Sequence, residues 1–207
     1  MFDTVLRTPQ NGPWFVLIRC HGKDGAASVV ELLADFDMLL RSVPAGSLKI
    51  DRYAAAFLFD ADAAGVDATL TEFRDRYRGH FGDLDQVGHG SWISSATHGV
   101  PVGCFVFHDP TTSTGSLEDH LIPMVRKQWP TRTSAAEQYF DTHIEADDPV
   151  SASPAQRWKA VITTVSQFHH PGSAMSRVLH RDRLPRKHFQ ASAAARELAT
   201  FLTSVPW

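Results

Sequence analysis

Residues 54–65 read AAAFLFDADAAG, and this stretch is the strongest fold signal in the sequence. A continuous apolar run from Ala54 to Phe59 is typical of a strand that is buried on both faces of a sheet. Two carboxylates, Asp60 and Asp62, follow the run directly. We therefore expect a central strand whose carboxyl end carries a pair of acidic side chains.

Strand and helix patterns alternate on both sides of this run. Strand-like segments are WFVLIRC at 14–20 and VGCFVFHD at 102–109, and apolar residues recur at helical spacing within 29–40 and 68–81. Helices separating strands favour parallel pairing. The sequence therefore predicts an α/β fold with a mainly parallel sheet flanked by helices.

Helical periodicity takes over in the last third of the chain. We predict an α/β core over residues 1–133 and a helical C-terminal extension over residues 134–207 that packs on the core. The carboxyl ends of the core strands are where such sheets usually bind ligands. Asp60 and Asp62 are expected at that edge, together with His21 at the end of the first strand.

Composition and charge are those of an ordinary globular chain. The sequence has 207 residues, 43% of them hydrophobic, and a formal net charge of −3 from 20 Lys and Arg against 23 Asp and Glu. Such a balance supplies no bulk positive field for nucleic acid or membranes. The N-terminus lacks a cationic segment followed by an apolar one, and no window of about 18 apolar residues occurs. We expect a cytoplasmic protein without a membrane partner.

The Asp60 and Asp62 pair has two interpretations. Carboxylates spaced Asp-x-Asp at a strand end can turn toward one divalent cation, and Mg²⁺ prefers such oxygen ligands together with water and substrate phosphates. Alternatively, both residues merely end the strand and start the next helix, since Asp is common in caps and turns. We favour the metal site.

AAAFLFDADAAG resembles the Asp-x-Asp segment of Toprim domains, and FVLIRCHGKDG at 15–25 resembles the first motif of that family. The resemblance implies a Toprim-like fold, Mg²⁺ or Mn²⁺ at Asp60 and Asp62, and phosphoryl transfer on nucleic acid. His21 stands where the family has a glutamate that handles a proton or the metal. By this resemblance His21 is the catalytic candidate, and its imidazole titrates near neutral pH.

Later segments are similar to a bacterial Toprim-related group, related to the nuclease module of overcoming-lysogenization-defect proteins. These segments are GCFVFHDPTTSTGSLEDHLIP, KAVITTVSQFHHPGSAMSRVLHRD and the terminal ELATFL. Within the first of them, Ser116 and Asp119 have the spacing of a capping box and predict a helix start. Glu118 is free of that role and is the candidate for a further metal or supporting carboxylate.

Basic residues cluster at the end of the segment KAVITTVSQFHHPGSAMSRVLHRD and just after it. Arg177, Arg181, Arg183, Arg186 and Lys187 form the strongest local positive feature of the sequence, which Asp182 interrupts. Such a cluster can hold phosphates and is the candidate nucleic-acid-binding surface. A solvated surface is the alternative.

Three functional hypotheses follow. The first is a metal-dependent nuclease or a nucleotidyl or phosphoryl transferase that acts on nucleic acid, with Asp60 and Asp62 on the metal. The second is a catalytically inactive Toprim-like binding module, in a homo-oligomer or a larger assembly, which the loss of the glutamate at His21 favours. The third is a haloacid-dehalogenase-like phosphatase with Asp60 as nucleophile. Ala63-Ala64-Gly65 argues against the third, because Gly-Thr is expected there.

Overall fold

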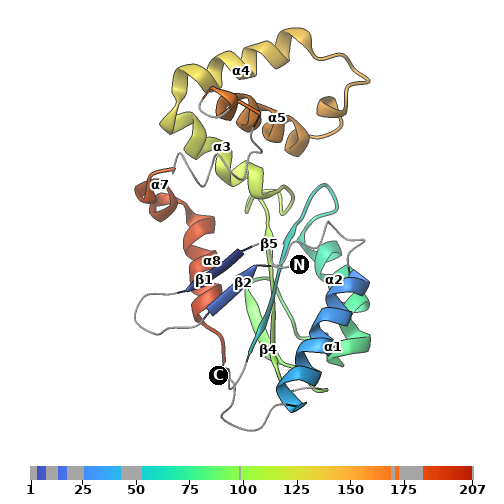
Figure 1. Ribbon diagram of the computed structural model, residues 1–207. Helices are drawn as coiled ribbons and strands as arrows, with labels where there is room; N and C mark the ends of the chain where they lie inside the picture. The colour runs from blue at the N-terminus through green and yellow to red at the C-terminus, as the bar shows by residue number, and fades with distance from the viewer. Residues whose placement is uncertain are drawn as a thin grey trace.

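The computed structural model describes residues 4–7, 14–17, 26–42, 53–97, 99–168, 171–172 and 184–206. The strands are β1 (Thr4–Arg7), β2 (Trp14–Leu17), β3 (Ala55–Asp60), β4 (Ser91–Ser94) and β5 (Pro101–Phe107). The α-helices are α1 (Ala26–Ser42), α2 (Val66–Phe81), α3 (Leu117–Gln128), α4 (Pro130–His143), α5 (Pro154–Gln167), α7 (Arg186–Ala191) and α8 (Ala193–Thr203). Within the described residues the chain is therefore of mixed α/β class, as expected (Figure 1).

The main sheet has the strand order β3-β5-β4. β3 and β5 are parallel, and their register pairs Asp60 with Phe107. β4 runs antiparallel to β5, so the three-stranded sheet is mixed, whereas we expected a mainly parallel one. The sequence did not reveal β4 because SWIS is only four residues long and lies among glycines and serines, where period-2 alternation cannot be read.

Two layers of helices cover this sheet. On one side, α1 and α2 pack against β3 and β5 (Figure 1), around the buried aromatic residues Phe57, Phe73 and Tyr77. On the other side, α8 places Phe201 against Phe105 and Phe107 of β5. Because β5 is buried on both faces, it reads as an uninterrupted apolar run in the sequence.

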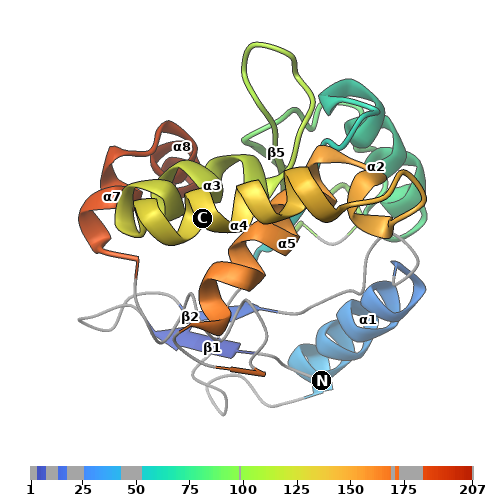
Figure 2. The same cartoon turned by 90° about the horizontal axis from the view of Figure 1, so that it is seen from above.

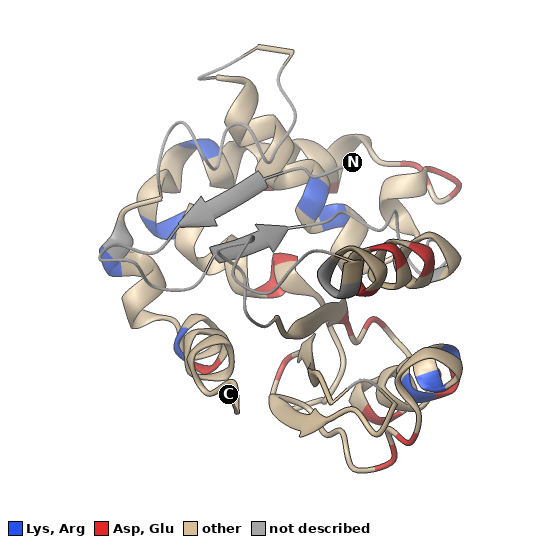
Figure 3. Ribbon diagram, turned by 60° about the horizontal axis from the view of Figure 1, so that its bottom comes forward, with Lys and Arg blue, Asp and Glu red and all other residues tan. Residues whose placement is uncertain are grey.

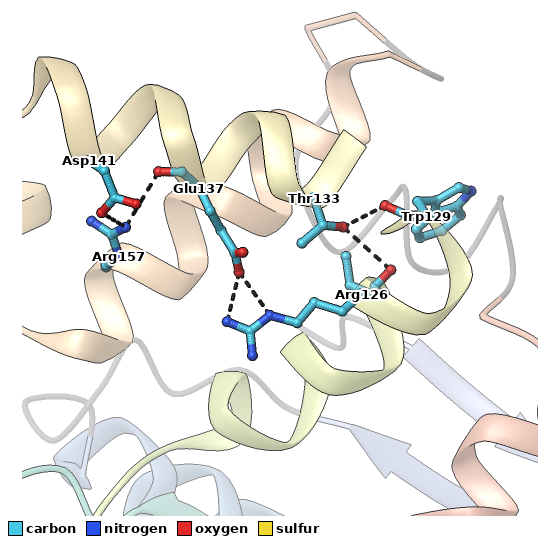
Figure 4. A network of polar contacts seen from close by, with 7 residues as sticks. Arg126, Trp129, Thr133, Glu137, Asp141 and Arg157 are labelled. Atoms are coloured by element: carbon cyan, nitrogen blue, oxygen red, sulfur yellow. Dashed lines mark hydrogen bonds and ion pairs between the residues drawn. The ribbon is translucent and has the colours of Figure 1, made fainter. Parts of the chain in front are cut away.

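Helices α3, α4 and α5 form a separate helical layer beyond the carboxyl edge of β3 and β5 (Figures 1 and 2). Their core contains Leu121, Val125, Val161 and Val165. Polar contacts tie the three helices together at the surface: Arg126 of α3 pairs with Glu137 of α4, and Arg157 of α5 pairs with Asp141 of α4 (Figure 4). Helix α4 runs across the boundary between residues 133 and 134 that the sequence suggested.

The N-terminal segment adds a second, two-stranded sheet. β1 and β2 pair antiparallel, with Thr4 opposite Leu17. β2 falls within the predicted strand at residues 14–20, but it pairs with β1 and not with the main sheet, where we expected it. β1 was not predicted because its four residues TVLR are too short for a pattern. None of the helices in the described ranges has both the length and the apolar character that a bilayer span requires.

Candidate acidic site at the sheet edge

Asp60 connects the sheet to the helical layer. It is the last residue of β3, and its Oδ1 accepts a hydrogen bond of 2.8 Å from the backbone N–H of Leu117, the first residue of α3. The first N–H groups of a helix have no partner inside the helix and carry partial positive charge, so a carboxylate is a suitable acceptor there. The strand end and the helix start are thus held against each other by one charge-assisted bond.

The surroundings of Asp60 oppose its ionisation. Burial is the largest cause that raises the pKa of this carboxyl above its usual value, and the Leu117 N–H acts in the opposite direction. The negative charges of Glu118 and Asp62 raise the pKa further, whereas the positive charge of Lys159 lowers it. Three carboxylates and one ammonium therefore lie within electrostatic reach of one another at this edge.

Within this group, Glu118 is the carboxylate whose charge and oxygens are least balanced by neighbouring groups. The residue is only 4% exposed, although glutamate is among the residues least often fully buried. Its Oε1 lies 3.7 Å from Nζ of Lys159 in α5, and its Oε2 is buried with no hydrogen-bond partner among the residues that the structure describes. Buried carboxylate oxygens normally have partners, so an unpartnered one indicates a position where a cation or a water could bind.

Asp62 occupies a loop that is fixed by its backbone. Its N–H donates to the carbonyl of Gly115 at 2.7 Å, and the N–H of Gly115 donates back to the carbonyl of Asp62 at 2.9 Å. Asp62 has a φ of 50°, in the left-handed region that Asp tolerates better than most residues. The residue is exposed, so its carboxylate can turn without displacing the backbone.

The donor set of this edge fits Mg²⁺ or Mn²⁺. Mg²⁺ is usually held by one or two carboxylates and completes its shell with water and substrate phosphates. Asp60 and Glu118 supply two such carboxylates from neighbouring elements, and Asp62 a third nearby. Across the described part of the chain, no three side chains of His, Cys, Asp or Glu are already arranged to hold a metal ion, so water and phosphate oxygens have to complete the shell.

The other acidic residues of this edge have structural partners. The carboxylate of Asp119 accepts from the backbone N–H and the hydroxyl of Ser116, so the predicted capping box is confirmed. Asp109 follows β5 and accepts from the N–H and hydroxyl of Thr111, and these bonds hold its pKa below the usual range. Both carboxylates stabilise turns, which leaves Glu118 as the unassigned acid of this segment.

Several predicted site residues lie outside the described part of the chain. His21, Arg177, Arg181 and Arg183 are among them, so the convergence of His21 with Asp60 and Asp62 stays a prediction. Arg186 begins α7, but its side chain is not described, and Lys187 beside it is exposed.

Lys159 is the residue of this edge that sequence reasoning missed. It lies on α5, 41 positions after Glu118, within a segment whose helical pattern gives no sign of a neighbouring carboxylate. Only the packing of α5 against α3 brings the two side chains together. A lone lysine on the partly polar face of a predicted helix is a weak signal, because most such residues are solvated.

Comparison with known proteins adds no assignment, since no family model, no curated protein and no solved structure matches the chain.

Proposed function

We propose that the chain is a divalent-metal-dependent enzyme of Toprim type that cleaves or forms phosphodiester bonds in nucleic acid. The observation that carries the proposal is the buried Oε2 of Glu118, which has no hydrogen-bond partner among the described residues and is within electrostatic reach of a second carboxylate, Asp60. Two acidic groups brought together at a strand end and a helix start, away from solvent, are costly unless a cation joins them.

In this proposal each residue has a distinct task. Asp60 and Glu118 would hold Mg²⁺ or Mn²⁺, with the exposed Asp62 as a further carboxylate nearby. When bound, the ion would supply Lewis-acid stabilisation of the charge that develops on the phosphate. Lys159 leaves Glu118 and places its ammonium on a phosphate oxygen, where it acts as a point charge. His21 is proposed to handle the proton of the reacting oxygen.

Cleavage assays test the proposal. Purified protein is incubated with single- and double-stranded DNA and RNA, with Mg²⁺, with Mn²⁺ or with EDTA. We expect metal-dependent cleavage or ligation that falls at least about a hundredfold in Asp60→Asn and Glu118→Gln, because both changes keep shape but remove a charged ligand. Asp109→Asn is the matched control, since that carboxylate lies at the same sheet edge but serves a turn. No metal-dependent activity on any of these substrates would overturn the catalytic proposal.

A catalytically inactive binding module is the second candidate, and one observation favours it. Lys159 already lies beside Glu118, and the Leu117 N–H already bonds Asp60, so part of the acidic charge is balanced by the protein itself. A module that uses Lys159 as its permanent counter-ion needs no metal. In that case Lys159→Ala should destabilise the fold, and divalent cations should leave wild-type stability unchanged.

A further inference from the structure

We propose that Lys127, Lys187 and His188 form a second site, which binds a phosphate group of a nucleic-acid chain. The choice of nucleic acid as the source of the phosphate rests on the proposed function. The site itself rests on the arrangement of two helices that lie far from each other in the sequence.

The three residues meet where the end of α3 approaches α7. Lys127 lies in the last turn of α3, and Lys187 and His188 lie in α7. In both views of the chain, α7 lies near one end of α3 (Figures 1 and 2). His188 is only 6% exposed, and its Nε2 lies 3.4 Å from Oε1 of Gln128, the neighbour of Lys127. The imidazole is thus anchored between the helices, with exposed lysines on either side.

The charge at this position has no counter-ion within the described residues. Neither lysine forms an ion pair with another described residue, whereas Arg76, Arg78, Arg126 and Arg157 all do. Burial first, and then the charges of Lys127 and Lys187, lower the pKa of His188, and no carboxylate of the described residues acts on it in the opposite direction. Arg74 and Arg196 also form no ion pair with a described residue, but their guanidinium groups donate to backbone carbonyls, of Val87 and Gln190 respectively. Figure 3 shows where the Lys and Arg residues of the described chain lie relative to its Asp and Glu residues.

Phosphate fits this arrangement chemically. Two ammonium groups attract an oxyanion, and the negative charge of a phosphate placed beside them reduces their repulsion of a protonated imidazole. His188 can then take up a proton and donate a further hydrogen bond. Binding at this site should therefore be coupled to proton uptake, which a merely solvated pair of lysines would not show.

The phosphate site is separate from the acidic site. Glu118 and Lys127 are nine positions apart on α3, which corresponds to about 14 Å along the helix and to opposite faces at about 100° per residue. A phosphate at Lys127 therefore does not compete with a cation at Glu118. The two sites can be tested independently of each other.

The first experiment measures binding of a fluorescently labelled single-stranded 20-nucleotide DNA by anisotropy, in EDTA and over a range of salt concentrations. Lys127→Ala and Lys187→Ala should each weaken binding by about threefold and reduce the salt slope by roughly 0.7 to 1, whatever the DNA sequence. Arg78→Ala is the matched control, because it removes the same charge from an exposed residue on α2. Unchanged affinity in the lysine variants, or an equal loss in Arg78→Ala, would overturn the proposal.

The second experiment follows the imidazole signals by NMR during a pH titration with and without inorganic phosphate. The signal missing in His188→Gln belongs to His188, and phosphate should raise its pKa in the wild type but not in the double variant of Lys127 and Lys187. A His188 pKa that phosphate does not move would overturn the site. A shift with phosphate but unaltered DNA binding would overturn nucleic acid as the source. DNA binding is measured in EDTA, which removes divalent cations. Both results therefore keep their meaning even if the protein proves to have no metal-dependent enzymatic activity.

Discussion

At the scale of single residues, the ionised carboxylate of Asp60 is unfavourable in the folded chain. Asp60 gains one bond from the Leu117 N–H but loses solvent and faces the charges of Glu118 and Asp62. Between the ordinary pKa of about 3.8 and the raised folded value, the native chain holds a proton that the unfolded chain has released. The contribution of Asp60 to stability therefore falls as pH rises through this window.

Asp60→Asn should relieve that cost while it removes a metal ligand. The amide oxygen of Asn can still accept from the Leu117 N–H, so only the charge is lost. We expect the midpoint of thermal unfolding at pH 7, without metal, to rise by roughly 2–4 °C, the effect of about 1 kcal/mol in a chain of this size. Calorimetry at pH 3.5 and pH 7 checks this, since the gain should shrink at the lower pH. A lower midpoint at pH 7 would show that the charge of Asp60 is stabilising.

Residue roles were predictable from sequence where they depend on near neighbours. Ser116 and Asp119 form the predicted cap because both partners lie within one helical turn. Asp60 ends its strand as predicted, but β3 lies at an edge of the sheet and leaves Leu58 exposed, whereas we expected a strand buried on both faces. The burial of Glu118 and its contact with Lys159 were not predictable, because both depend on how α5 packs against α3.

At the scale of elements, β5 is the strand on which the sheet depends. Trp92 of β4 stacks on Phe201 of α8 with ring centroids 4.6 Å apart, and its Nε1 donates to the Phe201 carbonyl at 2.8 Å. Both rings lie over Gly103, where an added Cβ would be 2.6 Å from Trp92 and 2.7 Å from Phe201. The absence of a side chain at Gly103 is what allows α8 to approach the sheet.

Gly103→Ala should therefore destabilise the fold through overpacking, by about 1–3 kcal/mol. Gly79→Ala is the matched control, because Gly79 lies within α2 and an added Cβ there has no atom within 4 Å. Gly79→Ala should stabilise the folded chain by up to about 1 kcal/mol, because alanine has a higher helix propensity than glycine. Urea unfolding of both variants measures the difference. Equal effects of the two substitutions would contradict the close packing at Gly103.

Elements with long, regular patterns were found in the sequence, and short ones were not. The apolar spacing within 29–40 and 68–81 predicted two helices, and the structure has α1 and α2 there. The apolar run that precedes Asp60 predicted a strand, and the structure has β3 there. β1 and β4 have four residues each, which is too few for any periodicity, whereas the equally short β2 lies within a longer apolar run. The sheet was expected to be mainly parallel because β4 was missed and because residues 14–20 were assigned to the same sheet as β3 and β5.

At the scale of the whole molecule, one contact at the acidic site links the sheet to the helical layer, and a second joins two helices of that layer. The Asp60 bond to Leu117 holds the start of α3, and the Lys159 contact with Glu118 brings in α5. Any cation bound there would touch both parts of the chain at once. Sequence could place the acidic residues at the edge of a sheet, but not the helical layer above them, because the direction of α3 is set by packing in three dimensions.

Calorimetric titration with Mn²⁺ is the most direct test of the central claim that Asp60 and Glu118 form a cation site. We expect saturable binding to the wild type, binding at least about tenfold weaker in Asp60→Asn and in Glu118→Gln, and unchanged binding in Asp109→Asn, because only the first two remove a proposed ligand. Absence of binding to the wild type, or equal affinity in all three variants, would contradict the claim.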